Sequence, residues 1–199
     1  MKNFETPLAI TMGDPSGIGP EIILKSVVET KLNNFLVFGD SLVFDSLIKS
    51  LGLPLTINKI SELSESIFEE DYINLFETSK LNHLPHYGKI SKECGKASFD
   101  AIMKSIELAK QGKVSGIVTA PISKKALNLA HINYPGHTEI LAGYSNNKAV
   151  SMMLLNKHIK TVLVTLHCSM KQALDRITIQ NELDAIINAA LGCKLFGIE

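Results

Sequence analysis

The stretch Leu8–Glu21, LAITMGDPSGIGPE, decides the fold class. The residues before Gly13 are apolar, which predicts a short buried strand, and a loop rich in glycine and proline follows. Pro20 suits the first turn of a helix because its missing N–H would be unpaired there, and Glu21 suits the positive end of the helix dipole. The stretch therefore predicts a strand, a glycine loop and a helix that runs to about Lys31.

The alternation of strand and helix continues to about Ala130. Residues 55–93 are less regular and contain one strand candidate. Alternation of this kind predicts an α/β protein with a mainly parallel sheet. The further predicted segments are strands at 35–38, 73–76 and 116–120, and helices at 41–51, at 95–113 and after the capping residue Ser123.

The pattern changes further along the chain. Val150–Leu155 and Ile159–Val164 are strand candidates, and the connection between them is too short for a parallel crossover, so we expect an antiparallel hairpin. A helix is predicted over Asp184–Leu195. We therefore expect a first α/β domain over 1–130 and the start of a second α/β domain, incomplete in this chain, over 131–199.

The composition argues against several classes of function. Lys and Arg together number 20 and Asp and Glu together number 20, so the chain lacks the basic excess typical of nucleic-acid binding. No apolar run approaches the length of a membrane span, and Met1–Thr6 has no secretory leader pattern. Cys94, Cys168 and Cys193 have no C-x-x-C spacing, so we expect reduced thiols in a cytoplasmic protein.

Two turns from strand to helix are candidate anion sites. The Gly13–Glu21 turn, which contains Asp14, would bring backbone N–H groups and a helix N-terminus toward a ligand. It matches neither the dinucleotide fingerprint nor the P-loop, so a tight structural turn is the alternative. Lys124, at the end of Thr119–Lys124, could face a phosphate or carboxylate, and an ordinary surface lysine is the alternative.

Two histidines are stronger candidates. In Tyr134–Glu139, Thr138 is expected to cap a helix, which would place His137 just before a helix N-terminus where an anion could bind. His167 is expected to end the apolar strand that begins near Ile159. Since α/β sheets bind ligands at the carboxyl ends of strands, His167 is a candidate metal ligand, with a hydrogen-bonded core histidine as the alternative.

Other histidines and cysteines are expected to be structural. His83 and His86 are three residues apart, but Pro85 would break a helix between them, so we expect surface histidines rather than metal ligands. His158 is expected to be solvated in the hairpin turn. Cys168 and its neighbouring histidine would point to opposite faces of a strand, so we expect a packed thiol rather than a nucleophile.

Four motifs together resemble a known family. In chain order they resemble the 4-hydroxythreonine-4-phosphate dehydrogenases of vitamin B6 biosynthesis, and the resemblance spans essentially the whole chain. The first loop is also similar to that of the isocitrate and isopropylmalate dehydrogenases. The resemblance thus implies two α/β/α domains of that type, the second incomplete here. The motifs are GDPSGIGPE at 13–21, TAPISK at 119–124, PGHTE at 135–139 and TLH at 165–167.

The resemblance implies an oxidoreductase. It implies oxidation of 4-phosphooxy-L-threonine by NAD or NADP, followed by decarboxylation to 3-amino-2-oxopropyl phosphate. It also implies a divalent metal (zinc, magnesium or cobalt) held by three histidines, which would stabilise charge on the reacting oxygen. The expected assembly is a cytoplasmic homodimer with its active site at the interface. The expected binding partner is a small phosphorylated amino-acid substrate. We expect the protein to bind neither nucleic acid nor a membrane.

The site residues are carried over by matching motif positions. His137 and Thr138 match the substrate-binding pair of the family, and His167 matches a metal ligand. Asp14 and Lys124 also match motif positions and are candidates for ligand-binding loops. The other two metal histidines, and the lysine, asparagine and arginine that hold the substrate, belong to motifs beyond residue 199.

Two departures from the family pattern leave alternatives open. His131 stands where the family usually has glycine, and Cys168-Ser169-Met170 stands where a proline-containing turn is usual. One alternative is a related dehydrogenase acting on another phosphorylated hydroxy acid, such as a threonate phosphate. Another is a truncated chain that binds an anion but has no turnover.

Overall fold

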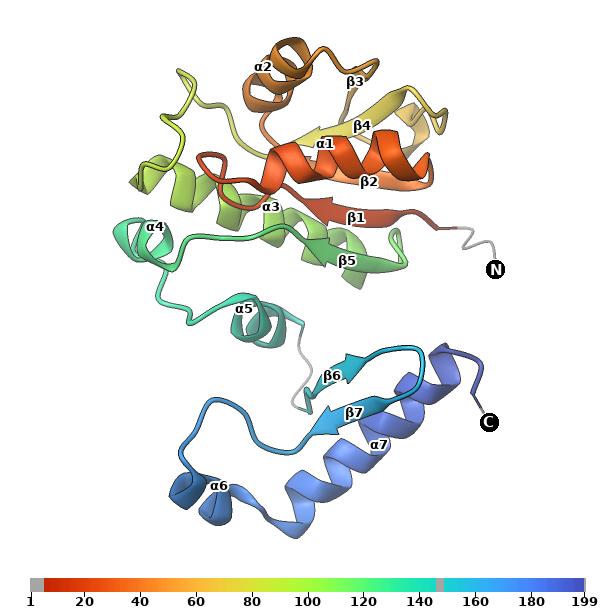
Figure 1. The fold of residues 1–199 in the computed structure, drawn as a ribbon, viewed down its shortest axis with the longest axis vertical. Helices are drawn as coiled ribbons and strands as arrows, with labels where there is room; N and C mark the ends of the chain where they lie inside the picture. The colour runs from red at the N-terminus through yellow and green to blue at the C-terminus, as the bar shows by residue number, and fades with distance from the viewer. Residues whose placement is uncertain (1–5, 146–148, 199) are drawn as a thin grey trace. The chain divides into compact units, whose positions relative to one another are not determined.

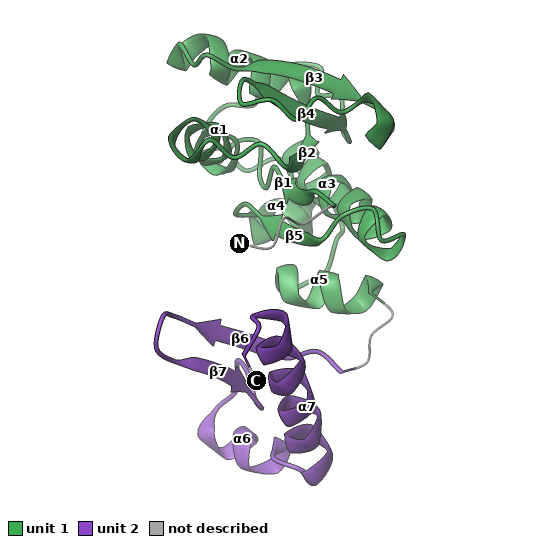
Figure 2. Ribbon diagram, turned by 90° about the vertical axis from the view of Figure 1, so that its right-hand side faces the viewer, with its two compact units in different colours: residues 1–145 green, residues 146–199 purple. Residues whose placement is uncertain are grey.

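The protein contains two compact units, Met1–Ser145 and Asn146–Glu199, which Figure 2 colours separately. The structure is a computed structural model that describes residues 6–145 and 149–198. Residues 1–5, which include most of the segment analysed for a leader, lie outside the described residues. The units divide after Ser145, whereas the domain boundary after residue 130 stays a prediction from the sequence. Across the described ranges, no helix combines the length and apolarity needed to span a membrane.

Unit 1, residues 1–145, is built on a parallel sheet, as the alternating pattern predicted (Figure 1). The strand order is β3-β4-β2-β1-β5, and every neighbouring pair is parallel. Thr11 pairs with both Phe38 and Thr119, so the carboxyl ends of β1, β2 and β5 lie level at one edge of the sheet. The strands are β1 (Leu8–Thr11), β2 (Phe35–Gly39), β3 (Thr56–Ile60), β4 (Tyr72–Glu77) and β5 (Gly116–Thr119).

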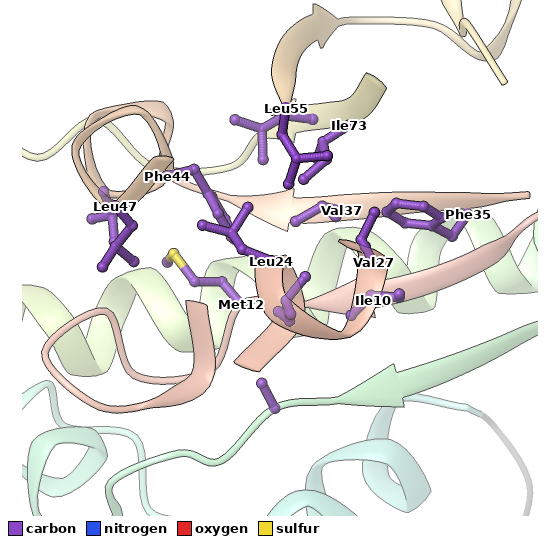
Figure 3. Close-up of a cluster of buried hydrophobic side chains, with 14 of the residues drawn as sticks. Ile10, Met12, Leu24, Val27, Phe35, Val37, Phe44, Leu47, Leu55 and Ile73 are labelled. Carbon is purple, nitrogen blue, oxygen red and sulfur yellow. The ribbon is translucent and has the colours of Figure 1, made fainter. Parts of the chain in front are cut away.

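Helices cover both faces of this sheet (Figure 1). Successive residues of a strand point to opposite faces, so Val37 packs with α1 and α2, whereas Phe38 packs with α3. Figure 3 shows the first of these clusters, in which Phe44 and Leu24 meet strand residues. The helices of unit 1 are α1 (Gly19–Thr30), α2 (Ser41–Leu51), α3 (Lys92–Lys110), α4 (Lys124–Leu129) and α5 (His137–Tyr144), with a short 3₁₀ turn, η1 (Leu63–Glu65).

One strand of unit 1 was not expected from the sequence. β3 lies at the edge of the sheet beside β4, in the region that looked irregular. Only Ile60 of β3 is buried, and the amide of Asn58 donates to the side-chain oxygen of Asn74 on β4. A polar edge strand lacks the apolar run that marks a buried strand, which explains why the pattern was missed.

Unit 2, residues 146–199, begins with the predicted hairpin of β6 (Met152–Leu155) and β7 (Lys160–Leu163), which is antiparallel. Two helices follow, α6 (Met170–Arg176) and α7 (Ile179–Leu195). Helix α6 was not predicted, and α7 begins before the expected start at Asp184. Side-chain caps explain both starts, since Ser169 forms a capping box with Gln172 and Thr178 accepts from the backbone of Asn181.

Candidate substrate site

The loop after β1 is a closed turn in which one carboxylate oxygen of Asp14 accepts two hydrogen bonds. Asp14 is 6% exposed, and its Oδ1 accepts hydrogen bonds from Ser16, at 2.9 Å from the backbone N and 2.8 Å from Oγ. The backbone N of Asp14 donates to the carbonyl of Pro121 at 2.9 Å. Gly13 has φ +74°, and a Cβ there would lie 2.4 Å from the same carbonyl oxygen. Asp14 therefore holds this loop in shape, and the loop is tied to the turn after β5.

The turn after β5 leads into α4 and presents Lys124. Ser123 caps the helix as predicted, with its Oγ accepting from the backbone N of Ala126 at 3.2 Å. Lys124 is the first residue of α4 and is exposed. The helix packs closely on α3, since a Cβ at Gly95 would lie 2.0 Å from the carbonyl oxygen of Ala126. Lys124 thus extends from a helix whose position is fixed by backbone contact.

Helix α5 begins two residues earlier than it would if Thr138 were its N-cap. Gly136 is the N-cap and His137 is the first helical residue, so the expectation that Thr138 caps the helix was wrong. Glu139 lies in the first turn, and a Cβ at Gly136 would lie 3.4 Å from its Oε2 and 4.0 Å from the Cε of Lys124. The side chains of Lys124 and Glu139 therefore both border the start of α5.

His137 is half-buried and lies against the backbone of Ala120, at the end of β5. Burial lowers the pKa of its imidazole below the ordinary value, and the hydrogen-bonding Ala120 backbone opposes that shift. Its Nε2 is buried and has no hydrogen-bond partner among the residues that the structure describes. A neutral imidazole with one unsatisfied nitrogen is suited to hydrogen bonding with a ligand.

Three of the predicted residues therefore meet at one edge of unit 1. Asp14 is bonded to Pro121, His137 lies against Ala120, and Lys124 reaches Gly136 beside it. The partly buried Thr138 follows His137 in the same helical turn. This edge carries the carboxyl ends of β1 and β5, the position at which parallel sheets bind ligands.

His167 belongs to unit 2 and is not on a strand. β7 ends at Leu163, so the expectation that His167 ends the strand was wrong. The side chain is exposed, and its φ of 49° places the backbone in the left-handed region. Among the described residues, the pairing of β7 with β6 ends where Leu163 pairs with Met152, four residues before His167.

The described residues do not assemble the metal centre that the resemblance implies. Across 6–145 and 149–198, no group of three or more His, Cys, Asp or Glu side chains could hold a metal ion. His83, His86 and His158 are exposed, in agreement with their predicted surface positions. The three cysteines are free, and Cys94 is the buried one.

Asp40 and His131 are two residues outside the predicted site that fix the backbone around them. Oδ1 of Asp40 caps α2, and its Oδ2 accepts from the hydroxyl of Ser79 and the backbone N of Leu81, at 3.0 and 2.8 Å. His131 has φ +61° and follows α4, where two backbone bonds of the Schellman type close the helix. The sequence offered one indication of this left-handed backbone: the family resemblance leads us to expect glycine where this chain has His131.

Comparison with known proteins decides the family. Residues 31–199 match the sequence model of the Pyridoxal phosphate biosynthetic protein PdxA family. The chain belongs to this family. It is 45% identical over 199 residues to a 4-hydroxythreonine-4-phosphate dehydrogenase of Beijerinckia indica, covering 100% of this chain and 59% of that relative. The family resemblance found in the four motifs is thereby confirmed for an N-terminal portion.

One further sequence relative and one solved structure also match most of this chain. A Fusobacterium nucleatum protein, provisionally named a D-threonate 4-phosphate dehydrogenase, is 34% identical and covers 98% of this chain and 60% of that relative. The crystal structure of a Klebsiella pneumoniae 4-hydroxythreonine-4-phosphate dehydrogenase is 31% identical with a TM-score of 0.86, covering 96% of this chain and 59% of that one. The chain thus spans about three fifths of the length of these relatives. Its parallel-sheet α/β fold is that of the solved family structures.

Proposed function

We propose that these residues form the N-terminal portion of an enzyme that oxidises 4-phosphooxy-L-threonine with NAD or NADP. The C3 hydroxyl would lose its proton to solvent, and the C3 carbon would transfer its hydrogen as a hydride to the cofactor. The β-keto acid would then lose its carboxylate as carbon dioxide and take up a proton, giving 3-amino-2-oxopropyl phosphate. The membership of the chain in a family whose relatives are named as dehydrogenases carries this proposal.

The edge of unit 1 supplies plausible substrate contacts. His137 is neutral at neutral pH because burial lowers its pKa, so its free nitrogen would hydrogen-bond a polar group of the substrate. The exposed Lys124 would supply a positive charge for the phosphate, and Thr138 would supply a hydroxyl beside the first helical amides of α5. Asp14 would act through the shape of its loop, since its Oδ1 accepts two hydrogen bonds within that turn.

The finer features of the proposal follow from the family resemblance. They are a second α/β domain that begins near residue 131, an arrangement of the isocitrate dehydrogenase type, and a homodimer with a shared active site. They also include His167 as one ligand of a divalent metal, a cytoplasmic setting, and no nucleic-acid or membrane partner. We further propose that the 199-residue chain alone has no turnover, because its described residues form no metal cluster.

A chimera tests the proposal. The 199 residues would be joined to the remaining C-terminal part of the Beijerinckia indica relative, and the unextended chain would be assayed beside it. We expect NADH formation from 4-phosphooxy-L-threonine by the chimera and none by the chain alone. A folded chimera without turnover would count against the proposed reaction, and turnover by the chain alone would contradict its proposed inactivity.

Variants of the chimera test the assigned roles. His167→Ala should lower kcat by at least about a hundredfold, while the matched control His158→Ala, in the exposed hairpin turn, should leave the rate unchanged. His137→Ala and Lys124→Ala should chiefly raise KM, because they remove substrate contacts. An unchanged rate in His167→Ala would remove that residue from the metal site.

The alternative substrate is D-threonate 4-phosphate, which the name of the Fusobacterium nucleatum relative supports. It carries a hydroxyl where 4-phosphooxy-L-threonine carries an amine, so one assay can compare the two substrates. A kcat/KM at least about tenfold higher for the threonate would reassign the substrate while keeping the reaction class.

A further inference from the structure

Glu139 is an acidic residue at the edge of unit 1 where an anionic substrate is proposed to bind. It is partly buried in the first turn of α5, two residues after His137. A Cβ at Gly136 would lie 3.4 Å from its Oε2, so the carboxylate turns back toward the beginning of the helix. The side chain therefore lies beside the proposed substrate contacts, although the proposed function gives it no role.

The carboxylate of Glu139 has no partner within the described part of the chain. Across residues 6–145 and 149–198, it forms neither an ion pair nor a hydrogen bond. In α1, by contrast, the first-turn acid Glu21 pairs with Lys25 one helical turn later, at 2.5 Å. The residue four positions after Glu139 is a glycine, so the same pairing is not open to it. The carboxylate of Glu139 is therefore available to a ligand.

A negative side chain at an anion site is unfavourable unless it meets a positive group of the ligand. Like charges at contact distance repel each other, and they repel more strongly where water is partly excluded. The proposed substrate carries a phosphate and a carboxylate, and its amine is its one positive group. Glu139 would therefore weaken the binding of this substrate unless its carboxylate faced the amine.

Glu139 and Lys124 form a pair of opposite charges that matches the substrate. Both border Gly136, since a Cβ there would lie 3.4 Å from Oε2 of Glu139 and 4.0 Å from Cε of Lys124. In 4-phosphooxy-L-threonine the amine is on C2 and the phosphate is on the oxygen of C4, so the two groups flank C3. A substrate whose phosphate lies at Lys124 can therefore direct its amine to Glu139. His137 is neutral and does not compete for either charge.

We propose that Glu139 binds the amine of the substrate and so gives the enzyme its preference for an amino acid over a hydroxy acid. This assignment rests on the proposed function for the identity of the substrate. An ammonium donates a charge-assisted hydrogen bond to a carboxylate, whereas the corresponding hydroxyl of D-threonate 4-phosphate donates a neutral one. The threonate also lacks the positive charge that offsets the repulsion between Glu139 and the anionic groups of the ligand.

Chemical-shift titration of the 199-residue chain with 4-phosphooxy-L-threonine and with D-threonate 4-phosphate tests the assignment. We expect the amine ligand to bind at least about fivefold more tightly than the threonate. Glu139→Gln should weaken binding of the amine ligand by at least about fivefold and should not weaken binding of the threonate, so the preference disappears. The matched control Glu182→Gln removes an exposed acidic residue from the first turn of α7 and should keep the preference within about twofold.

The carboxyl carbon of Glu139 gives a second readout that needs no variant. Its Cδ resonance in the unmodified chain should move on addition of the amine ligand and move much less with the threonate. This readout decides the assignment if Glu139→Gln fails to fold by circular dichroism. A resonance that does not move at saturating amine ligand would contradict the proposed contact.

Three further results would overturn the assignment: no binding of either ligand at millimolar concentration, equal affinity for both, or an unchanged preference in folded Glu139→Gln. A variant that loses stability but keeps the preference would show that the carboxylate serves only the helix dipole. A chimera that turns over while Glu139→Gln keeps the preference would overturn the amine contact alone. Loss of the preference in Glu139→Gln, beside a folded but inactive chimera, would keep the amine contact and overturn the proposed reaction.

Discussion

Helices α2 and α7 both carry apolar residues at helical spacing, but they differ in what covers those residues. In α2, Val43 and Phe44 are 0% exposed because they pack on the five-stranded sheet of unit 1. In α7, Ile186 is 65% exposed and Leu195 is 83% exposed beside a two-stranded sheet. Ala185 is the one buried apolar residue of unit 2 among 149–198.

The difference teaches that an amphipathic pattern indicates a buried face only where a partner layer exists. A two-stranded sheet with one long helix cannot enclose a core, whereas three or more strands with covering helices can. We therefore expect most of the folding stability of this chain to come from unit 1. The candidate substrate edge lies there.

The largest expected contrast comes from truncating one residue in each unit. Phe44→Ala should lower the free energy of unfolding by about 3–5 kcal/mol, because it removes a fully buried ring. Ile186→Ala should change it by less than about 0.5 kcal/mol, since that side chain is mostly in solvent. Urea denaturation of both variants measures the two values. Equal losses would show that α7 is packed in solution.

Gly95 in unit 1 and Gly192 in unit 2 allow the same comparison to be made for backbone contacts. Gly95→Ala should destabilise by about 1–3 kcal/mol, because its Cβ would meet backbone atoms of Ala126. Gly192→Ala should be neutral or stabilise by up to about 1 kcal/mol, since it gains helix propensity. Its Cβ would meet only the end of the flexible Met153 side chain, 3.0 Å away. Unfolding curves that reversed this order would contradict the packing of α4 on α3.

His131 in unit 1 and His167 in unit 2 both have positive φ, and they allow a comparison with a smaller expected effect. His131→Gly should raise the free energy of unfolding by about 1 kcal/mol, because glycine adopts positive φ without the steric cost. His167 also has positive φ, but it lies in unit 2 and is exposed. His167→Gly is therefore expected to leave the main thermal transition unchanged. A stabilisation by both substitutions would mean that the two units unfold together.

The smallest expected effect is a pH dependence. The pKa of His137 is lowered in the folded state, so below about pH 6.5 the unfolded state binds the proton more readily. That stability is present above the unfolded pKa and is lost as pH falls toward the folded value. The stability of the unmodified chain relative to His137→Gln should therefore decrease between about pH 8 and about pH 5. A constant difference across that range would show that the ring is not desolvated.

Much of unit 1 could be predicted because its signals are local. Pro20 marks the start of a helix, Gly52 ends another, and the apolar runs of β1 and β2 alternate with those helices. β3 could not be predicted in the same way, because an edge strand needs only one buried residue and its partner comes from elsewhere in the sequence. The capping box at Ser169 was a readable local signal for α6 that the apolar periodicity obscured.

The candidate site could be predicted only in part, for a tertiary reason. Motifs identified Asp14, Lys124 and His137, but their meeting at one edge depends on β1 and β5 being neighbours. The role of Asp14 within its own turn and the contact of His137 with Ala120 depend on side-chain packing. His167 was placed on a strand because apolar periodicity continues past Leu163, whereas strand pairing ends there.

The most direct test of the central claim is a chemical-shift titration of the 199-residue chain with 4-phosphooxy-L-threonine. The proposed substrate contacts lie at the carboxyl edge of unit 1, and binding there does not require turnover. We expect backbone amide shifts to concentrate at Ala120–Lys124 and Gly136–Glu139, and His137→Ala to reduce them. Shifts confined to other segments, or none at saturating substrate, would contradict this claim.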